Sequence, residues 1–438
     1  MSSSAFRFFV RSSSSFTGTV RVPGDKSISH RSIMLGSLAE GTTRVTGFLE
    51  GEDSLATLRA FRAMGVRISD PESGCVEIEG VGLDGLSAPK EALDVGNSGT
   101  SMRLMSGILA GQAFHSSLIG DASLSKRPMS RVAAPLALMG GQVDTAEKGF
   151  PPLHVKGGKR LSGIEYSMPM ASAQVKSCLL LAGMYAEGET AVIEPAPTRD
   201  HTERMLRSLG YPVKTEGSRI SLVGGGSLKA LDLDVPADVS SATFFMVAAA
   251  IAEEADVLLT HVGMNPTRDG VIQILKLMGA DLSLENERMV GGEPVADVRV
   301  KSSRLTGIDI PEALVPLAID EFPALFIAAA CAEGTTRLTG AEELRVKESD
   351  RIAVMAQGMK AIGITAQETP DGIDITGGEF QGGKVTAHGD HRIAMSFAVA
   401  GARSKDGVEI EDCKNVATSF PNFVTLAEEL GMNIELSD

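Results

Sequence analysis

The sequence predicts an α/β protein with two domains, each made of three copies of one supersecondary unit. Helix-like runs alternate with strand-like runs along the chain, which is typical of mixed sheets packed on helices. The alternation recurs as a repeat. A glycine ends a similar helix six times along the chain, at Gly65, Gly140, Gly210, Gly279, Gly363 and Gly431. A chain of 438 residues is too long for one ordinary core, so the units divide as three and three, with a break near Val235-Pro236.

The first unit shows how each element is recognised. Residues 29–38 carry apolar side chains at helical spacing, and residues 42–48 alternate apolar with polar side chains, as a half-buried strand does. Asp53 is suited to cap a second, amphipathic helix, which Gly65 ends. Residues 66–68 then begin the next strand. We expect this order of elements in every unit.

The second, amphipathic helix is predicted again at residues 132–139, 205–209, 271–278, 352–362 and 423–430. A solenoid would also repeat, but solenoid repeats run about 20 to 45 residues and present similar faces. Here the terminal glycines lie 75, 70, 69, 84 and 68 residues apart, and each unit opens with a different polar cluster. The sequence therefore favours two closed domains over a solenoid.

Each unit opens its first helix with a polar or charged cluster. The six clusters begin at Asp25, Gly96, Ala171, Asp238, Asp320 and Gly389. A helix N-terminus presents unpaired N–H groups and a partial positive charge, so a cation there is unfavourable unless an anion binds beside it. Lys26 and Ser27 are expected in the first helical turn, with Arg31 following; a lysine at that position favours an anion site over the alternative of a solvated surface lysine. A P-loop is excluded because the glycines that it requires before Lys26 are missing.

The other clusters allow a functional and a simpler interpretation. Residues 96–100 combine glycine with neutral donors, which suits a capped turn or an anion site, and Arg127 favours the anion site. Residues 345–351 form the densest charge cluster, and their alternative is a solvated face with ion pairs inside one helix. Asp320 heads an apolar helix, where capping is the simplest role. Arg392 places one more cation at a helix start.

Composition excludes several classes of protein. A net charge of −15 and the absence of Trp argue against a nucleic-acid binder, which needs a basic face and stacking aromatic rings. The longest apolar runs, residues 244–252 and 324–332, fall short of the about 20 residues that a membrane helix needs. His388 and His391 lack a third ligand at a usual spacing, so we expect no metal site.

The cysteines and the N-terminus suggest a cytoplasmic protein. The four cysteines are scattered without a CxxC pair, which fits reduced thiols. Residues 1–16 are rich in serine and contain two arginines, which is weakly similar to an organellar transit peptide. A strand-like run at residues 17–22 follows at once, so we expect residues 1–16 to form a short disordered tail.

Five motifs are long and follow one another in a specific order: residues 24–31 (GDKSISHR), 96–100 (GNSGT), 126–129 (KRPM), 343–351 (ELRVKESDR) and 389–392 (GDHR). Together they resemble the EPSP synthase (3-phosphoshikimate 1-carboxyvinyltransferase) family. The resemblance extends from about Thr17 to Asp438, and residues 171–176 and 265–268 are closest to the bacterial branch.

The resemblance implies a two-domain inside-out α/β barrel with three repeated βαβαββ-type units per domain. Residues 24–235 would form the first domain and residues 1–23 with 236–438 the second, with the substrates in the cleft between them. The family moves the enolpyruvyl group of phosphoenolpyruvate onto the 5-hydroxyl of 3-phosphoshikimate, on the route to chorismate and the aromatic amino acids, and releases phosphate. No metal or organic cofactor is implied, and we expect a cytoplasmic monomer with no nucleic-acid or membrane partner.

The resemblance also assigns the site residues. The 3-phosphoshikimate site would comprise Lys26, Ser27, Arg31, Ser172, Ala173, Gln174, Arg199, Asp320 and Lys347, and the phosphoenolpyruvate site Lys26, Asn97, Gly99, Arg127, Gln174, Arg351 and Arg392. Both substrates carry a carboxylate and a phosphate, which suits the cations and N–H donors found from the residues alone. Asp320 is the candidate base for the hydroxyl, and Glu348 and Lys26 are both candidate proton donors to the methylene carbon. The herbicide glyphosate occupies the phosphoenolpyruvate site in this family.

Two alternative functions remain open, and at one position the chain departs from the pattern of the family. The sister transferase that acts on UDP-N-acetylglucosamine has the same fold, but it typically carries a reactive Cys in the loop at residues 121–131, which contains none here. It also has Lys-Asn in place of Lys26-Ser27. A non-catalytic anion-binding relative is the second alternative, and the joint presence of Asp320, Glu348 and Lys26 argues against it. Many relatives place a Lys where this chain has Thr418-Ser419, so a phosphate contact from that segment is not implied.

Overall fold

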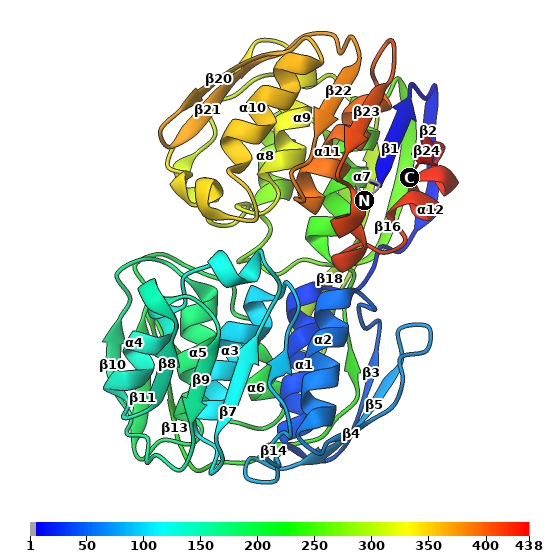
Figure 1. Ribbon diagram of the computed structural model, residues 1–438. Helices are drawn as coiled ribbons and strands as arrows, with labels where there is room; N and C mark the ends of the chain where they lie inside the picture. The colour runs from blue at the N-terminus through cyan, green and yellow to red at the C-terminus, as the bar shows by residue number, and fades with distance from the viewer. Residues whose placement is uncertain (1–5, 438) are drawn as a thin grey trace. The chain divides into compact units, whose positions relative to one another are not determined.

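The computed structural model describes residues 6–437. The chain forms two compact domains (Figure 1): the first domain is Gly24–Val235, and the second domain is Met1–Pro23 together with Pro236–Asp438. Within the described residues, each domain contains six α-helices and three sheets. Helices alternate with the strands of mixed sheets throughout, which confirms the predicted α/β class.

The first domain contains three repeats. The first comprises α1 (Lys26–Leu38), β3 (Ala39–Thr46), α2 (Glu52–Ala63), β4 (Arg67–Ile68) and β5 (Val76–Val81), with β14 (Leu228–Lys229) and β15 (Leu233–Asp234) added to its sheet. The second comprises β6 (Leu93–Asp94), α3 (Gly99–Ala110), β7 (Ser116–Ile119), α4 (Ser130–Leu138), β8 (Gln142–Thr145) and β9 (Leu153–Lys156). The third comprises β10 (Glu165–Ser167), α5 (Ala173–Gly183), β11 (Glu189–Ile193), α6 (His201–Ser208), β12 (Lys214–Glu216) and β13 (Arg219–Val223).

The second domain contains the other three repeats. The fourth comprises β2 (Ser15–Val20), α7 (Val239–Ile251), β16 (Glu254–Gly263), α8 (Gly270–Leu277), β17 (Asp281–Val290) and β18 (Glu293–Lys301). The fifth comprises α9 (Phe322–Cys331), β19 (Thr335–Leu338), α10 (Arg351–Ala361), β20 (Thr365–Thr369) and β21 (Gly372–Thr376). The sixth comprises β22 (Gly383–Thr386), α11 (His391–Gly401), β23 (Val408–Glu411), α12 (Phe423–Glu429), β24 (Asn433–Ser437) and β1 (Arg7–Arg11). Short 3-10 helices are η1 (Leu124–Lys126), η2 (Glu147–Gly149), η3 (Glu312–Leu314), η4 (Glu342–Val346) and η5 (Lys414–Thr418).

The strands of the repeats pair in one common order. In the second repeat β6 runs parallel to β7, β7 is antiparallel to β9, and β9 is antiparallel to β8, and the third repeat pairs likewise. The first repeat takes its first strand from β14 and β15, and the fourth takes it from β2. In the fifth repeat the first strand is reduced to two isolated parallel bridges. The predicted βαβαββ repeat is therefore confirmed.

The first helix of every repeat is buried, and the second helix buries one side. Helices α1, α3 and α5 are almost wholly buried in the first domain, as are α7, α9 and α11 in the second. Each group packs side by side and lies against its sheets, around one apolar core per domain. Helices therefore occupy the centre of each domain, and over residues 6–437 the six sheets stay separate.

The N-terminal segment differs from the prediction. Residues 1–5 lie outside the described residues, but residues 7–11 form β1, so the prediction of a disordered tail is wrong from there onward. β1 lies between β23 and β24 in an antiparallel sheet, with Phe8 and Val10 only 1% and 0% exposed. A two-residue apolar alternation is too short to reveal a strand whose partners lie about 400 positions away along the chain.

Candidate functional site

The six polar clusters of the sequence lie at the N-termini of the six buried helices. Asp25 Oδ1 accepts a hydrogen bond from the Ile28 amide at 2.9 Å, and four other helices are capped in the same way, by Ser98, Ser172, Asp238 and Asp390. The exception is α9, where Glu321 stands at the cap position without a capping bond. The side chains beside these caps therefore lie at the positive ends of helix dipoles.

Lys26 is the first residue of α1 and is partly buried. Its Nζ lies 2.5 Å from Oδ2 of Asp53, and the two side chains are 25% and 8% exposed. The prediction that Asp53 caps α2 is wrong, because Gly51 holds the cap position and makes no side-chain bond. The carboxylate faces a cation instead, which is a stronger partner than a backbone amide. Lys26 is therefore not the fully solvated lysine of the simpler interpretation.

Arg31 is buried one turn further along α1. Its Nε donates to Oγ1 of Thr202 at 2.7 Å, and its Nη2 donates to Oγ of Ser177 at 2.9 Å. Its Nη1 donates to the carbonyl oxygen of Ser27, also at 2.9 Å. Arg31 thus joins α1 to α5 and α6.

The turn before α3 is organised around Asn97. Its Nδ2 donates to Oδ2 of Asp121 at 2.7 Å, and its Oδ1 accepts from Nη2 of Arg127 at 2.8 Å. Gly99 is the first residue of α3 and is buried; a Cβ there would lie 3.4 Å from Nη1 of Arg127. The open side of Gly99 therefore faces the guanidinium group.

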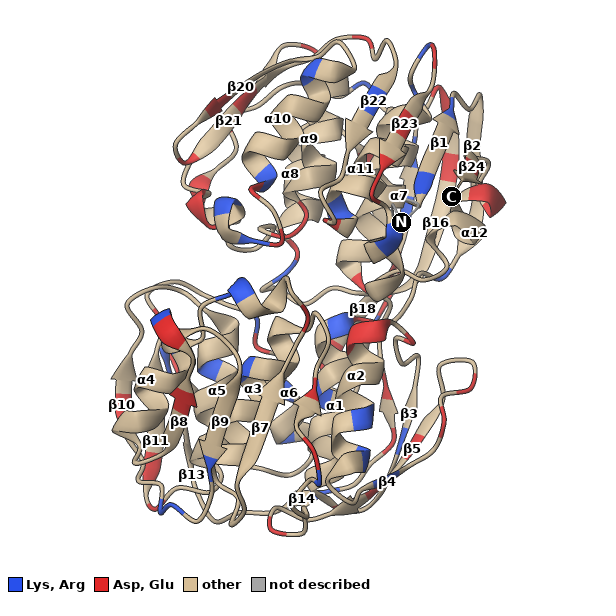
Figure 2. Ribbon diagram, in the orientation of Figure 1, with Lys and Arg blue, Asp and Glu red and all other residues tan. Residues whose placement is uncertain are grey.

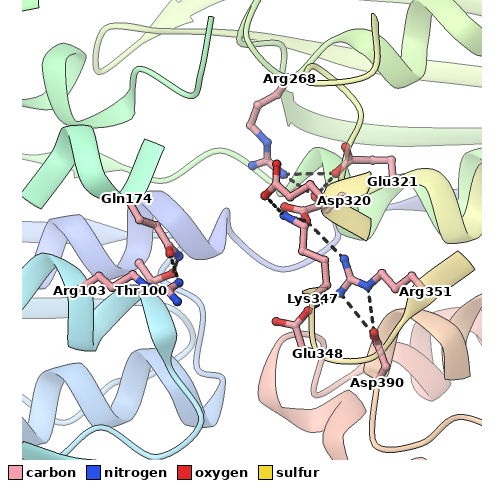
Figure 3. A network of polar contacts seen from close by, with 12 residues as sticks. Thr100, Arg103, Gln174, Arg268, Asp320, Glu321, Lys347, Glu348, Arg351 and Asp390 are labelled. Atoms are coloured by element: carbon pink, nitrogen blue, oxygen red, sulfur yellow. Dashed lines mark hydrogen bonds and ion pairs between the residues drawn. The ribbon is translucent and has the colours of Figure 1, made fainter. Parts of the chain in front are cut away.

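Gln174 at the start of α5 lies between two side chains of α3 (Figure 3). Its Oε1 accepts from Arg103, and its Nε2 donates to Oγ1 of Thr100 at 3.1 Å. Ser172 caps α5, Ala173 begins it, and Arg199 lies partly buried in the loop between β11 and α6. The first-domain cluster, as we use the term, is Lys26, Asn97, Arg103, Arg127 and Gln174.

Arg351 in the second domain is buried among three carboxylates (Figure 3). Its Nε lies 2.9 Å from Asp390, its Nη2 2.7 Å from Glu348 and its Nη1 3.4 Å from Asp320, while its side chain is 1% exposed. Burial opposes the charge of the guanidinium, but Asp390, Glu348 and Asp320 outweigh burial and raise the pKa of Arg351. Burial likewise acts to raise the pKa of Asp390, and the adjacent Arg351 holds it below the ordinary value.

Lys347 and Asp320 complete this group. The Nζ of Lys347 lies 2.6 Å from Glu343 and 3.6 Å from Oδ1 of Asp320, so Asp320 lies between two cations, Lys347 and Arg351. The pairs Lys347–Glu343 and Arg351–Glu348 are local but do not lie within one helix, because Lys347 and Glu348 lie between η4 and α10. Asp320 and Asp390 contribute from the starts of α9 and α11. The second-domain cluster, as we use the term, is Asp320, Lys347, Glu348, Arg351 and Asp390.

Arg392 follows Asp390 in the first turn of α11 and is partly exposed. Among residues 6–437, no carboxylate forms an ion pair with its guanidinium. The segment that differs from many relatives lies beside this turn, because Nδ2 of Asn415 donates to the carbonyl oxygen of Gly389 at 2.7 Å. The hydroxyl of Thr418 donates to the carbonyl oxygen of Asn415, so it is used within the segment.

The two clusters offer anion binding and proton transfer. Basic and acidic residues are interspersed in both domains (Figure 2), so the cations of the clusters are local features of an acidic chain.

The part of the chain that the structure describes has no group of three or more His, Cys, Asp or Glu that could hold a metal ion. It also has no helix both long and apolar enough to cross a membrane.

Several residues that shape the clusters were missed by sequence reasoning. Asp390 and Asp53 pair with Arg351 and Lys26, and Arg268 and Glu321 form a buried network with Asp238 and Ser240. Figure 3 shows Arg268 beside Glu321, the residue that follows Asp320. Asp390 belongs to the motif at residues 389–392 and is the N-cap of α11. Its place in that motif is the sequence signal that could have indicated its importance. The partners of Arg268 lie about 30 or more positions away along the chain, at the starts of α7 and α9, so no local pattern indicates them.

The sixfold repeat, with cations at its helix starts, defines a two-domain α/β protein suited to binding small anions. Comparison with known proteins gives the family. The family model described as EPSP synthase (3-phosphoshikimate 1-carboxyvinyltransferase) matches residues 10–426. The chain therefore belongs to the EPSP synthase family, as its motifs predict.

Individual relatives match over almost their full length. A Hydrogenovibrio crunogenus protein named 3-phosphoshikimate 1-carboxyvinyltransferase is 64% identical over 439 residues, covering 99% of each chain. A Methylococcus capsulatus protein of the same name is 65% identical over 420 residues, covering 96% of each. A solved EPSP synthase from Acinetobacter baumannii is 62% identical with a TM-score of 0.91, covering 99% of this chain and 100% of that one.

Proposed function

We infer that the chain is a 3-phosphoshikimate 1-carboxyvinyltransferase. It transfers the 1-carboxyvinyl group of phosphoenolpyruvate to the 5-hydroxyl of 3-phosphoshikimate, giving 5-enolpyruvylshikimate 3-phosphate and phosphate, a step toward chorismate and the aromatic amino acids. The observation that carries this proposal is the place of Asp320, a carboxylate 3.6 Å from Lys347 and 3.4 Å from Arg351 in a chain of this family. Those two cations hold the carboxylate in place, and a positioned carboxylate is the kind of group that accepts a proton from a hydroxyl.

The proposed binding roles are those that the motifs of the family imply. For 3-phosphoshikimate we propose Lys26, Ser27, Arg31, Ser172, Ala173, Gln174, Arg199, Asp320 and Lys347, and for phosphoenolpyruvate Lys26, Asn97, Gly99, Arg127, Gln174, Arg351 and Arg392. Asn97 and Gln174 accept hydrogen bonds from Arg127 and Arg103, and these bonds help to orient the two guanidinium groups for an anion. Arg31 and Arg351 are buried, so each offers only its remaining N–H donors.

The reaction needs two proton transfers in its first half. Asp320 takes the proton of the 5-hydroxyl as that oxygen bonds to C2 of phosphoenolpyruvate, and Glu348 or Lys26 gives a proton to C3, which becomes a methyl group. The adduct then loses phosphate and one proton from that methyl group, which restores the double bond. The ion pair with Arg351, at 2.7 Å, fixes the position of the Glu348 carboxylate.

We propose that the substrates bind in the cleft between the domains and draw the two clusters together. Cations in both clusters repel one another until anions lie between them, so the ligand-free enzyme is expected to be open. Small-angle scattering should show a smaller radius of gyration when 3-phosphoshikimate and phosphate are added. An unchanged radius would contradict closure driven by ligands.

One assay separates this proposal from the two alternatives. Phosphate release is measured with phosphoenolpyruvate and either 3-phosphoshikimate or UDP-N-acetylglucosamine. Release with 3-phosphoshikimate alone is expected. Release with the nucleotide sugar would identify the sister transferase, and binding of phosphoenolpyruvate without release would identify a non-catalytic relative. We further propose a cytoplasmic monomer, which sedimentation velocity and cell fractionation test.

A further inference from the structure

Lys176 is a buried lysine that the proposed mechanism does not use. It lies in α5, one turn after the cap residue Ser172, and its side chain is 1% exposed. Its Nζ is 2.7 Å from Oε1 of Glu203, 3.0 Å from Oε1 of Glu194 and 3.4 Å from the carbonyl oxygen of Thr198. An ammonium group has three N–H donors, and these three acceptors match them.

The three acceptors belong to one continuous segment, residues 194–203, which joins β11 to α6. Glu194 follows β11, Thr198 lies in the middle of the connecting loop, and Glu203 lies in the first turn of α6. Lys176 therefore fixes the beginning, the middle and the end of the segment to one helix. A second connection supports the same arrangement: Thr202 donates to Ser177 at 2.8 Å, beside Lys176 in α5.

Loss of the Lys176 charge would leave the segment under strain. Burial raises the pKa of Glu194, and the charge of Lys176 opposes that rise, so removing the ammonium removes a favourable partner of this carboxylate. Oε2 of Glu203 has no hydrogen-bond partner among the described residues, so Lys176 is the main compensation for a buried carboxylate. Two buried carboxylates without a cation repel each other and favour a position nearer to water. The loop would then shift away from α5.

Arg199 lies inside this segment, directly after Thr198. We propose that Lys176 is a positioning residue: by holding residues 194–203 against α5, it keeps Arg199 in a fixed place relative to Ser172 and Gln174 for the binding of 3-phosphoshikimate. This rests on the proposed function, which assigns those three residues to that substrate. Lys176 itself contacts neither substrate in this scheme.

Steady-state kinetics of Lys176→Met, Arg199→Ala and the double variant test the proposal. Lys176→Met should raise the KM for 3-phosphoshikimate about tenfold, because a misplacement of about 1 Å is costly. The KM for phosphoenolpyruvate should stay within about twofold and kcat within about threefold of the unchanged enzyme. The double variant should have the same 3-phosphoshikimate KM as Arg199→Ala, since Lys176 acts through Arg199.

A matched control is Lys156→Met, which removes a 44% exposed lysine paired with Asp144 in the same domain and should leave both KM values unchanged. If Lys176→Met does not fold, Glu203→Gln carries the test, because it keeps the shape of the side chain and removes one of the two carboxylates. The same selective rise in KM is expected.

Three results would overturn the proposal. One is a lower melting temperature for Lys176→Met with an unchanged 3-phosphoshikimate KM, which would show a purely structural role. Another is a double variant whose effects multiply, which would show that Lys176 does not act through Arg199. The third is a raised KM for Lys176→Met together with no effect of Arg199→Ala; this would remove Arg199 from both proposals while phosphate release still established the enzyme's activity.

Discussion

The two clusters hold their cations in different ways. In the first-domain cluster, Arg127 and Arg103 are held by the neutral side chains of Asn97 and Gln174. In the second-domain cluster, Arg351 is enclosed by Asp390, Glu348 and Asp320 (Figure 3). A neutral acceptor orients a guanidinium for an anion, whereas the carboxylates around Arg351 are held in place as groups that can exchange protons. The first cluster is therefore suited to binding, and the second combines binding with chemistry.

The largest expected effect comes from Asp320→Asn. Loss of the base should lower kcat by about 10²–10⁴-fold, while the KM for 3-phosphoshikimate changes only a few-fold. Stability should be retained, because Asp320 is not the cap of α9. Phosphate release and thermal unfolding measure the two quantities, with the exposed carboxylate variant Asp374→Asn as the control. Activity within a few-fold of the unchanged enzyme would remove Asp320 from the chemistry.

Arg351→Met tests the balance of charge in the second-domain cluster. It removes the ion-pair partner of the buried Asp390 carboxylate and should lower the free energy of unfolding by about 3–5 kcal/mol. Arg392→Met is the matched control, because Arg392 is partly exposed and has no ion pair within residues 6–437; its change should be about 0.5 kcal/mol or less. Urea unfolding followed by circular dichroism compares them. Equal changes in the free energy of unfolding for the two variants would show that the ion pairs of Arg351 with the carboxylates do not stabilise the protein.

Gly99→Ala tests the first-domain cluster. The added methyl group would lie 3.4 Å from Arg127 and 3.5 Å from Arg103, ordinary contacts that the fold tolerates. It should obstruct glyphosate, which is longer than phosphoenolpyruvate, and one methyl-sized misfit is worth about 1–3 kcal/mol. The unchanged enzyme should be inhibited by glyphosate, and the inhibition constant of the variant should rise about 10–200-fold while the KM for phosphoenolpyruvate rises less. The same inhibition in both proteins would show that Gly99 does not line the site.

The smallest expected effect is on the pH dependence of stability, which His30 in the first domain and Asp390 in the second should influence in different pH ranges. His30 in α1 is fully buried, and burial together with the charges of Lys26 and Arg31 lowers its pKa well below the ordinary value. The unfolded chain, with a histidine pKa of about 6.5, then binds the proton more tightly than the folded chain. Stability is thus complete above about pH 6.5 and falls by up to about 1.4 kcal/mol per pH unit below it.

Urea unfolding at pH 7.5, 6 and 5 measures this slope. His30→Asn should flatten it by one proton, and the exposed variant His154→Asn should not. Asp390 in the second domain has a lowered pKa, so its contribution is present above about pH 4 and is lost only as the pH falls further. Parallel curves for His30→Asn and the unchanged enzyme would contradict the buried neutral histidine.

Helix starts, and the capping residues of most of them, could be predicted from short stretches of sequence, and the repeat followed from their recurrence along the chain. Asp25 with Lys26 and Ser98 with Gly99 are capped helix starts whose signals span only a few residues, and the structure has them where the pattern predicts. Ion-pair partners could not be predicted in this way. Asp53 carries a good local signal for capping, yet it pairs with Lys26, because tertiary packing brings a cation within 2.5 Å.

The sequence by itself determined the α/β class, the sixfold repeat and the placing of cations at helix starts, since periodicity and capping act within about one turn of a helix. Only the tertiary structure decided that β1 pairs with β23 and β24, that Asp390 faces Arg351 from another helix, and that Lys176 holds residues 194–203. These contacts join segments far apart along the chain. Their energies depend on burial and on the distance between charges, which exist only once the chain has folded.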